Sequence, residues 1–296
     1  MMESIRHWLL AARPKTLPAA VVPVWVGLVL ADRLLGGAGI DFGLAWCTLL
    51  SALAIQLATN FFNDALDAEK GADTERRLGP LRASASGWIE APIMLRAACI
   101  ALGIAVAFSI PLVLTRGFPI ILIGLCSMLC AYAYTGGPFP LAYRGMGEIF
   151  VIIFFGIVAV AGTVFVQTGT LEIVGILVGI QVGLYSSVLI AINNLRDQAE
   201  DERSRKFTLA VVFGQTFAEI EIIAFCLLPP LLGGVWFLLG QLWWEAMVFP
   251  LALLPLSAAI IFGVLGNVPG RIYNRFLAMS AAQLLGFAIL LTLAAN

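Results

Sequence analysis

Long apolar stretches alternate with short charged segments along almost the whole chain. A helix needs about 20 mostly apolar residues to cross the hydrocarbon core of a bilayer, so each long stretch is a candidate membrane span. Between charged breaks the pattern predicts nine spans, at about 17–31, 43–66, 91–115, 118–135, 146–168, 172–194, 213–233, 245–265 and 274–294. The expected fold class is therefore all-α, a polytopic membrane bundle that forms a single domain over 1–296.

Two of these spans need comment. The first is shorter than a bilayer requires unless it begins near Pro14. The seventh contains Pro229 and Pro230, followed by Gly233 and Gly234. We expect these residues to end or bend that span, because proline removes a backbone donor and clashes with the preceding turn.

Composition supports a bilayer environment. Hydrophobic residues make up 61% of the chain and charged residues 12%, and the mean hydropathy is +0.98, which is far outside the range of soluble proteins. The formal net charge of -1 says little about partners, because the charges crowd into a few hydrophilic segments. Five isolated cysteines in apolar runs indicate neither a disulfide nor a metal framework. We expect a lipid bilayer around the chain and no nucleic acid as a partner.

The basic residues predict which side of the membrane each loop faces. Of the 17 lysines and arginines, 15 fall on the side of the N-terminus in a nine-span arrangement, and only Arg33 and Arg116 fall on the other side. Cytoplasmic loops of membrane proteins carry an excess of Lys and Arg. We therefore expect a cytoplasmic N-terminus, an outward-facing C-terminus and a multi-pass location in the cell (inner) membrane.

Two acidic, amide-containing segments, 63–73 and 193–201, hold seven of the 18 acidic residues of the chain. They end the second and the sixth span, and four intervening spans put both on the cytoplasmic face. Each repeats an asparagine and an aspartate four residues apart, a spacing that projects side chains from one face of a helix: Asn63 and Asp67, then Asn193 and Asp197 with Asp201 a further four on. The repeat suggests two related halves that line one central cavity.

Oxygen-rich side chains of this kind indicate a magnesium site. Mg²⁺ prefers hard oxygen ligands and typically binds through one or two carboxylates plus substrate phosphates. Basic residues, which hydrogen-bond phosphate oxygens, accompany both segments: Arg76, Arg77 and Arg82 after the first, and Arg196, Arg203, Arg205 and Lys206 around the second. The pattern favours a metal-bridged diphosphate, and ordinary solvated loops with mixed charges are the alternative.

Further short motifs accompany these segments. They are Arg13-Pro14-Lys15-Thr16, the Asn63 to Asp73 segment with Gly71, Gly79-Pro80-Leu81-Arg82, Tyr134-Thr135 followed by Gly137-Pro138, Gly147-Glu148, and Asn193-Asn194-Leu195-Arg196-Asp197 followed by Lys206 and Thr208-Leu209. In these residues the chain resembles the UbiA-type intramembrane prenyltransferases over nearly its whole length. Within that superfamily it is most similar to the branch that prenylates 1,4-dihydroxy-2-naphthoate in menaquinone synthesis. Two positions depart from the pattern: Arg205 replaces a usual glycine, and Arg76 a usual acidic or small residue.

The resemblance implies roles for particular residues. Mg²⁺ and its diphosphate would be bound by Asn63, Asp64, Asp67, Asp73, Asn193, Asp197 and Asp201. Direct contacts to the diphosphate would come from Asn63, Arg77, Arg82, Asn193, Arg196 and Lys206. Among these, Lys206 is also placed with the catalytic residues, because positive charge stabilises the leaving group as the allylic C–O bond breaks.

Two more side chains are candidates for the chemistry. An allylic carbocation is stabilised by polarizable groups, and aromatic faces attract cations. Tyr134, near the cytoplasmic end of the fourth span, is the aromatic residue that the resemblance favours. Glu148 begins the fifth span on the same side, where a costly ionisable group tends to be functional. It would orient the acceptor hydroxyl or accept a proton, and a carboxylate that is favoured by the helix dipole is the alternative.

The resemblance implies an enzyme that transfers a polyprenyl group from polyprenyl diphosphate to 1,4-dihydroxy-2-naphthoate, with Mg²⁺ as cofactor and loss of the carboxylate. One alternative is another aromatic acceptor, 4-hydroxybenzoate or homogentisate, because the donor machinery is shared. A second, from a different class, is an ion-coupled transporter. It predicts ionisable groups near mid-membrane, whereas the centres of the nine stretches carry essentially no charge.

Overall fold

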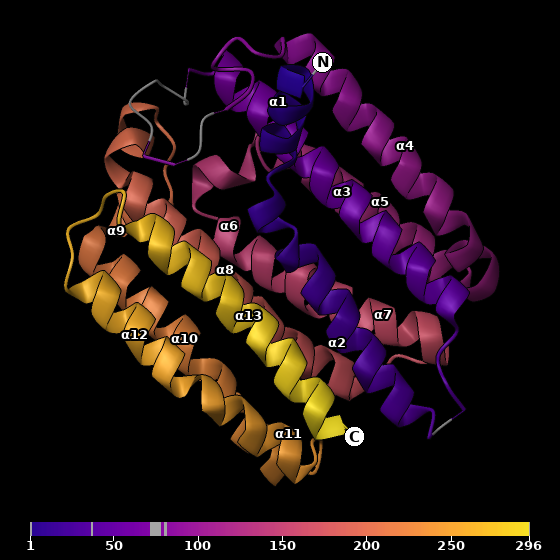
Figure 1. Ribbon diagram of the computed structural model, residues 1–296. Coiled ribbons are helices and arrows are strands. Elements are labelled where there is room, and N and C mark those ends of the chain that lie inside the picture. Colours follow the sequence, from indigo (N-terminus) through magenta and orange to yellow (C-terminus); the bar gives the residue numbers. More distant parts are fainter. Residues whose placement is uncertain (1, 37, 72–77, 80–81, 296) are drawn as a thin grey trace.

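The computed structural model describes residues 2–36, 38–71, 78–79 and 82–295. Throughout this part of the chain the regular structure is helical, without a strand, as predicted (Figure 1). The α-helices are α1 (Met2–Ala12), α2 (Pro18–Leu34), α3 (Phe42–Glu69), α4 (Ala91–Arg116), α5 (Phe118–Ala133), α6 (Gly147–Phe150), α7 (Ala159–Thr168), α8 (Ile173–Arg203), α9 (Leu209–Phe213), α10 (Gln215–Leu238), α11 (Trp244–Val248), α12 (Leu254–Leu265) and α13 (Tyr273–Ala295). Short 3-10 segments form η1 (Pro14–Thr16), η2 (Leu141–Arg144) and η4 (Phe249–Leu253), and η3 (Val151–Val158) is a π-helix.

Within the described residues, seven helical rods are long and apolar enough to cross a membrane. They are Phe42–Glu69, Ala91–Arg116, Gly147–Thr168, Ile173–Arg203, Gln215–Leu238, Trp244–Leu265 and Tyr273–Ala295. Ile5–Thr16 and α2 form an eighth candidate that is bent by 48°, and α5 is apolar but has only 16 residues. The rods fall on the stretches that the sequence predicted, while the count of nine crossings and the side of the N-terminus stay predictions.

Helix α8 is the centre of the bundle. In its most apolar window 61% of the residues are buried, against 22% to 39% in the other six long rods. Gly175, Gly179 and Gly183 recur every four residues, and a Cβ on Gly179 would lie 2.8 Å from the Cα of Ile157. Small residues at this spacing let two backbones approach closely in a membrane. This glycine stripe (Gly175, Gly179 and Gly183) therefore sets the axial position of α8 relative to the rod formed by α6, η3 and α7.

The π-helical segment η3 lies in that same rod. Its Gly156 packs directly on α8, since a Cβ there would lie 2.3 Å from the carbonyl oxygen of Gly179. Single π-helical turns inside α-helices are frequent at functional sites. Here the π-helical segment begins three residues after Glu148. Its wider turn therefore affects the direction in which Glu148 points relative to α7.

The prolines of α10 do not end this helix, so of the two expected outcomes, an end or a bend of the seventh span, the end is wrong. Helix α10 continues through Pro229 and Pro230 to Leu238. Pro230 lacks the amide that would bond to the carbonyl of Cys226. The Ser257 hydroxyl on α12 donates to that carbonyl at 3.4 Å instead. Neighbouring side chains of this kind make proline tolerable inside membrane helices.

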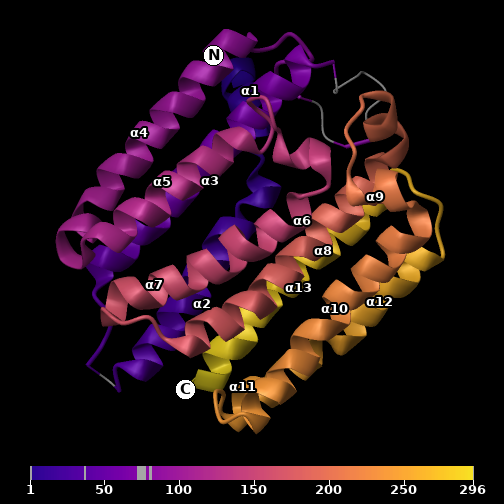
Figure 2. The same ribbon diagram turned by 180° about the vertical axis from the view of Figure 1, so that it is seen from behind.

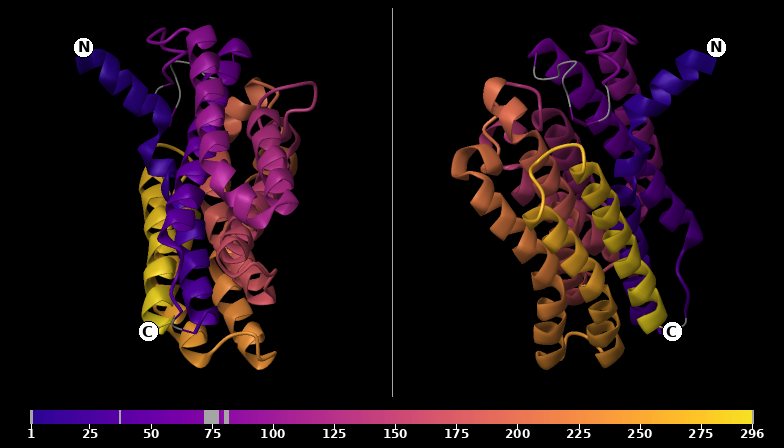
Figure 3. Two further views of the ribbon diagram at one scale, coloured as in Figure 1. Left: turned by 90° about the vertical axis from the view of Figure 1, so that its right-hand side faces the viewer. Right: turned by 60° about the vertical axis from the view of Figure 1, so that its left-hand side comes forward.

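The two ends of the bundle differ in character. Helices α1 and α9 and the segment 82–90 before α4 gather at one end, and α13 finishes at the other (Figures 1 and 2). Figure 3 shows α1 leaning outward from the bundle at the first of these ends. The C-terminal ends of α3 and α8 point to this same end (Figure 1). Both acidic motifs are thus brought to one end of the molecule.

Candidate active site

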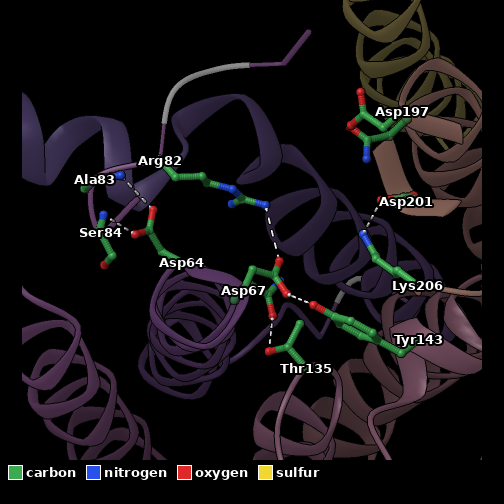
Figure 4. A network of polar contacts seen from close by, with 12 residues as sticks. Asp64, Asp67, Arg82, Ala83, Ser84, Thr135, Tyr143, Asp197, Asp201 and Lys206 are labelled. Carbon is green, nitrogen blue, oxygen red and sulfur yellow. Dashed lines mark hydrogen bonds and ion pairs between the residues drawn. The ribbon is translucent and has the colours of Figure 1, made fainter. Parts of the chain in front are cut away.

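The first acidic motif forms the C-terminal end of α3. Asn63 Oδ1 accepts a hydrogen bond from the Thr135 hydroxyl at 3.0 Å, and Asp67 Oδ1 accepts one from the Tyr143 hydroxyl at 2.9 Å. Arg82 approaches from the loop after α3, with Nη2 3.8 Å from Asp67 Oδ2 (Figure 4). The oxygens of this motif therefore face two neutral hydroxyl groups and one arginine, all supplied by other parts of the chain.

A ladder of amides leads along α3 to this motif. Asn60 Nδ2 donates to the carbonyl of Ala12 at 2.9 Å and to the hydroxyl of Thr16 at 3.1 Å. Gln56 Nε2 reaches the same hydroxyl at 3.3 Å. These bonds tie the break between α1 and α2 to α3, which gives the threonine of the Arg13-Pro14-Lys15-Thr16 motif a structural role.

Asp64 points away from Asp67 and holds the loop that follows α3 (Figure 4). Its Oδ2 accepts the amide of Ala83 at 3.1 Å and its Oδ1 the amide of Ser84 at 2.7 Å. Both carboxylate oxygens are engaged by backbone donors, next to Arg82. The predicted assistance of Asp64 to the metal would require it to share these oxygens.

Three residues of this first half were not assigned a role by the sequence. Besides Thr135 and Tyr143, Lys70 donates from Nζ to the carbonyl of Thr135 and lies 4.4 Å from the centre of the Tyr143 ring. Burial lowers the pKa of Lys70, and the charge of Asp67 opposes that change. Position was the available signal, because Lys70 lies inside the 63–73 segment and Thr135 follows Tyr134.

The second motif is closed by an arginine from its own helix. Arg196 donates to both carboxylate oxygens of Asp197, at 2.7 and 2.6 Å, and to Asn193 Oδ1 at 2.7 Å. Its Nη1 donates to Asn274 Oδ1 on α13 at 2.7 Å, and Asn274 donates to the carbonyl of Leu78 at 3.2 Å. Arg196, only 3% exposed, therefore occupies the oxygens that the sequence assigned to Mg²⁺ and joins α8, α13 and the loop after α3.

Asp201 lies one turn further along α8, beside Lys206. Lys206 Nζ is 3.3 Å from Asp201 Oδ1, and the Lys206 amide donates to the Asp201 carbonyl at 2.8 Å. The turn between them places Arg205 at φ +57°, a left-handed conformation that glycine adopts without steric cost. This conformation suits the glycine that the resemblance leads one to expect here, and Arg205 adopts it in spite of its Cβ.

Tyr143 links the two motifs. Burial raises the pKa of Tyr143, and the carboxylates of Asp67 and Asp201 raise it further, so the phenol lies within electrostatic reach of both. The Phe207 amide donates to the Tyr143 carbonyl at 3.2 Å and ties the loop after α8 to η2. Figure 4 shows Asp67, Tyr143, Lys206 and Asp201 as neighbours. The Tyr143 segment therefore contacts both the α3 motif and the loop that follows the α8 motif.

Tyr134 and Glu148 lie on another wall of the same end. A Cβ on Gly147 would lie 3.2 Å from the Tyr134 hydroxyl, so α6 packs against this phenol. Glu148 is only 2% exposed and accepts a hydrogen bond from Asn194 on α8 at 2.7 Å. Glu148 is thus a buried carboxylate between two helices and not a solvated helix start.

The metal assignment can be compared with these donors. Asp73 and Arg77 lie outside the described residues. In the rest of the chain, as far as the structure describes it, no three His, Cys, Asp or Glu side chains gather closely enough to hold a metal by themselves. The carboxylates and amides of both motifs are still hard oxygen donors, and Mg²⁺ commonly uses one or two carboxylates with water and substrate phosphates. The donor set fits Mg²⁺ provided that Arg196 yields Asp197.

The fold and this site together define a class of protein. The apolar rods identify an integral membrane protein, and the paired carboxylates and cations at one end of its bundle suit a phosphate-bearing substrate. The sequence signature described as the UbiA prenyltransferase family matches residues 20–284. Because this match covers most of the chain, the protein belongs to that family.

Curated relatives are similar over most of their length. A 1,4-dihydroxy-2-naphthoate octaprenyltransferase from Haemophilus influenzae is 32% identical over 294 residues, which cover 96% of this chain and 94% of the relative. One of the same name from Mycobacterium leprae is 36% identical over 216 residues, 72% of this chain and 71% of the relative. The fold resembles a UbiA homolog from Archaeoglobus fulgidus bound to DMAPP and Mg²⁺, with a TM-score of 0.70, 15% identity and coverage of 96% and 98%.

Proposed function

We propose that this protein transfers a polyprenyl group from polyprenyl diphosphate to 1,4-dihydroxy-2-naphthoate, with decarboxylation, to give a demethylmenaquinone precursor. Family membership makes the chain a prenyltransferase. The names of relatives at 32% to 36% identity support the choice of acceptor. The observation that carries the proposal is the meeting of two Asn-x-x-x-Asp helix ends, with Arg82 and Lys206 beside them, at one end of an apolar bundle.

The basic side chains bind the diphosphate in this proposal. Arg82 lies 3.8 Å from Asp67, and Lys206 lies 3.3 Å from Asp201. Both side chains can turn to phosphate oxygens as the substrate arrives. Arg77 is assigned the same task by resemblance. Arg196 would join them by exchanging Asp197 for phosphate. Charge-assisted hydrogen bonds of this kind stabilise the charge that develops on the leaving group.

Mg²⁺ is the proposed cofactor. When bound between the acidic motifs and the substrate, it would neutralise charge on the departing diphosphate. The proposed oxygen donors are Asn63, Asp67, Asp73, Asn193, Asp197 and Asp201, with Asp64 assisting. A related fold solved with DMAPP and Mg²⁺ supports metal dependence.

The bond changes follow from the proposed substrates. The allylic C–O bond breaks, and the diphosphate leaves with the electron pair. The ring carbon that carries the carboxylate forms the new C–C bond, and loss of carbon dioxide returns electrons to the ring. In this step the Tyr134 ring would stabilise the allylic cation. Glu148 would orient the hydroxyl group of the acceptor or accept a proton from it.

The apolar tail of the donor would lie among the spans or in lipid. We place the protein in the cell (inner) membrane with its site facing the cytoplasm, supported by the 15 of 17 basic residues on that predicted side. The ion-coupled transporter is not supported, because the charged residues of the site gather at the ends of helices α3 and α8.

Purified protein in detergent or lipid tests the proposal. It is incubated with polyprenyl diphosphate, 1,4-dihydroxy-2-naphthoate and Mg²⁺, with and without a chelator, and products are identified by mass spectrometry. We expect a prenylated, decarboxylated product that disappears with the chelator. Diphosphate release without this product would reopen the acceptor, and competition with 4-hydroxybenzoate and homogentisate would then identify it. No product and no diphosphate release in a folded sample would overturn the proposal.

A further inference from the structure

The second acidic motif has a second face. Consecutive residues on an α-helix point about 100° apart, so Asn193 and Asn194 address different neighbours. Asn193 accepts a hydrogen bond from Arg196 at 2.7 Å, together with Asp197. Asn194 instead donates from Nδ2 to Oε1 of Glu148 on α6, also at 2.7 Å. One turn of α8 thus serves the diphosphate residues on one side and a separate carboxylate on the other.

Only one oxygen of the Glu148 carboxylate accepts a hydrogen bond from another described residue. Glu148 is 2% exposed and Asn194 5% exposed. Oε2 of Glu148 receives no hydrogen bond from any other residue that the structure describes. A buried acceptor without a partner costs about 1–3 kcal/mol, and most buried polar atoms are satisfied. An oxygen held open at this cost points to a hydrogen-bond donor that arrives with a ligand.

The surroundings define which ligand suits this oxygen. Glu148 follows Gly147, which packs on the Tyr134 hydroxyl, and its charge acts on the same phenol. Glu148 forms no ion pair within the described residues, although the charge of Lys206 is felt there. A second anion would be repelled from a buried carboxylate. A neutral hydroxyl on an aromatic ring can instead donate to Oε2 while its ring packs among apolar side chains.

The position of Glu148 is set by helix packing. The glycine stripe of α8 presses on the rod that begins with α6, and the Ser187 hydroxyl donates to the Glu148 carbonyl at 3.4 Å. Rotation of α6 is restricted by these contacts. The hydrogen bond from Asn194 then selects which oxygen of the side chain stays open.

We propose that Asn194 is a positioning residue for Glu148, and that Glu148 Oε2 accepts a hydrogen bond from a ring hydroxyl of the aromatic acceptor. This inference rests on the proposed function and adds to it an acceptor subsite separate from the diphosphate site. Recognition at this subsite depends on a phenolic hydroxyl, and the carboxylate of the acceptor must point elsewhere.

Steady-state kinetics of Asn194→Leu, Glu148→Gln and the double variant test the subsite. Asn194→Leu should raise the KM for the aromatic acceptor about tenfold while the KM for polyprenyl diphosphate stays within about twofold. The double variant should be no worse than Glu148→Gln alone, because Asn194 acts through Glu148. Gln283→Leu, which removes another fully buried amide bonded to Ser257, is the control and should leave the acceptor KM unchanged.

A substrate analogue gives an independent readout. O-methylation of the recognised hydroxyl should weaken the acceptor strongly with the unaltered protein and little with Glu148→Gln. Additive losses in the double variant, or an equal rise of both KM values in Asn194→Leu, would overturn the inference while leaving the prenyltransferase intact. If Asn194→Leu does not fold, Asn194→Ser is measured in the same way. Failure of the proposed function would differ, because the unaltered protein would then prenylate no aromatic acceptor.

Discussion

The ends of α3 and α8 carry the same Asn-x-x-x-Asp spacing but different partners. At the end of α3, Asp67 faces a phenol at 2.9 Å and an arginine at 3.8 Å, both from outside the helix. At the end of α8, Asp197 is held by two short bonds from the adjacent Arg196. The first motif is held by hydroxyl groups and a more distant arginine from other parts of the chain, whereas the second is held by the adjacent arginine of its own helix.

This difference means that a ligand must displace different protein contacts at the two motifs. A ligand can reach Asp67 by displacing one phenolic hydrogen bond, which contributes about 1 kcal/mol, and the longer 3.8 Å approach of Arg82. At Asp197 it must replace a buried, bidentate ion pair, and a buried charge that loses its partner without a new one is strongly unfavourable. A diphosphate can offer Arg196 that new partner at the same moment as a metal takes Asp197. Binding at the α8 motif is therefore expected to require both ligands together.

The largest expected effect comes from removing the central aspartates. Asp67→Ala and Asp197→Ala should each reduce transfer by about a thousandfold or more, because transition-state charge loses its metal-binding oxygens. Their stabilities should differ: Asp197→Ala strands Arg196 and should lose about 3–5 kcal/mol, and Asp67→Ala much less. Product formation and thermal unfolding in detergent measure the two quantities.

A double variant separates these effects. Arg196→Met combined with Asp197→Ala removes the stranded charge and should recover most of the stability without recovering activity. Equal stability losses in the two single variants would show that the contrast between the motifs is absent in solution. Normal activity in either would remove that aspartate from the diphosphate site.

Arg196→Lys should have the next largest effect. Lysine keeps the charge but cannot form the planar fork that bonds Asp197 and Asn274 together. We expect kcat/KM to fall about thirtyfold. Arg82→Lys should cost less, because a lysine can keep an ion pair of this length with Asp67, and exposed Arg96→Lys on α4 serves as the control. Equal losses for Arg196→Lys and Arg82→Lys would contradict the difference between the motifs.

Asp64→Asn tests whether the first motif also holds its loop. The change weakens the bonds to the amides of Ala83 and Ser84, so hydrogen exchange at these two amides should accelerate. We expect activity to fall about tenfold with an unchanged Mg²⁺ concentration dependence. A shifted Mg²⁺ requirement with unchanged exchange would make Asp64 a metal ligand instead.

The smallest effect is expected at Arg205. Arg205→Gly removes the steric cost of φ +57° and should raise the free energy of unfolding by about 1 kcal/mol at most. Activity should stay within about twofold, because the Asp201 and Lys206 contacts do not depend on this side chain. Arg203→Gly, at the last residue of α8, is the matched control and should be destabilising by about 0.5–1 kcal/mol. Stabilisation by both variants would point to charge and not to backbone conformation.

The sequence was sufficient for the positions of the apolar rods, because apolar length is a local property, and for the shared end of the two motifs. It could not reveal partners that folding brings from elsewhere. Asp64 meets amides 19 and 20 residues away, and Arg196 meets Asn274 78 residues away. Likewise, the sequence around Pro230 predicts a helix end, because the donor that replaces its missing amide comes from Ser257 on another helix. Spacing predicts which residues share a face, and tertiary contacts decide what each oxygen binds.

The π-helical segment Val151–Val158 makes chain length itself a determinant of this site. A π turn accommodates an additional residue relative to an α turn, so deletion of one residue would turn the preceding segment by about 100° relative to α7. The glycine contacts run along the rod from Ile152 to Ala161, so a deletion would break some of them and turn Glu148 relative to α7. Conservative substitutions among the apolar side chains of this segment should be tolerated. The insertion or deletion of a single residue there would turn the Glu148 carboxylate away from Asn194.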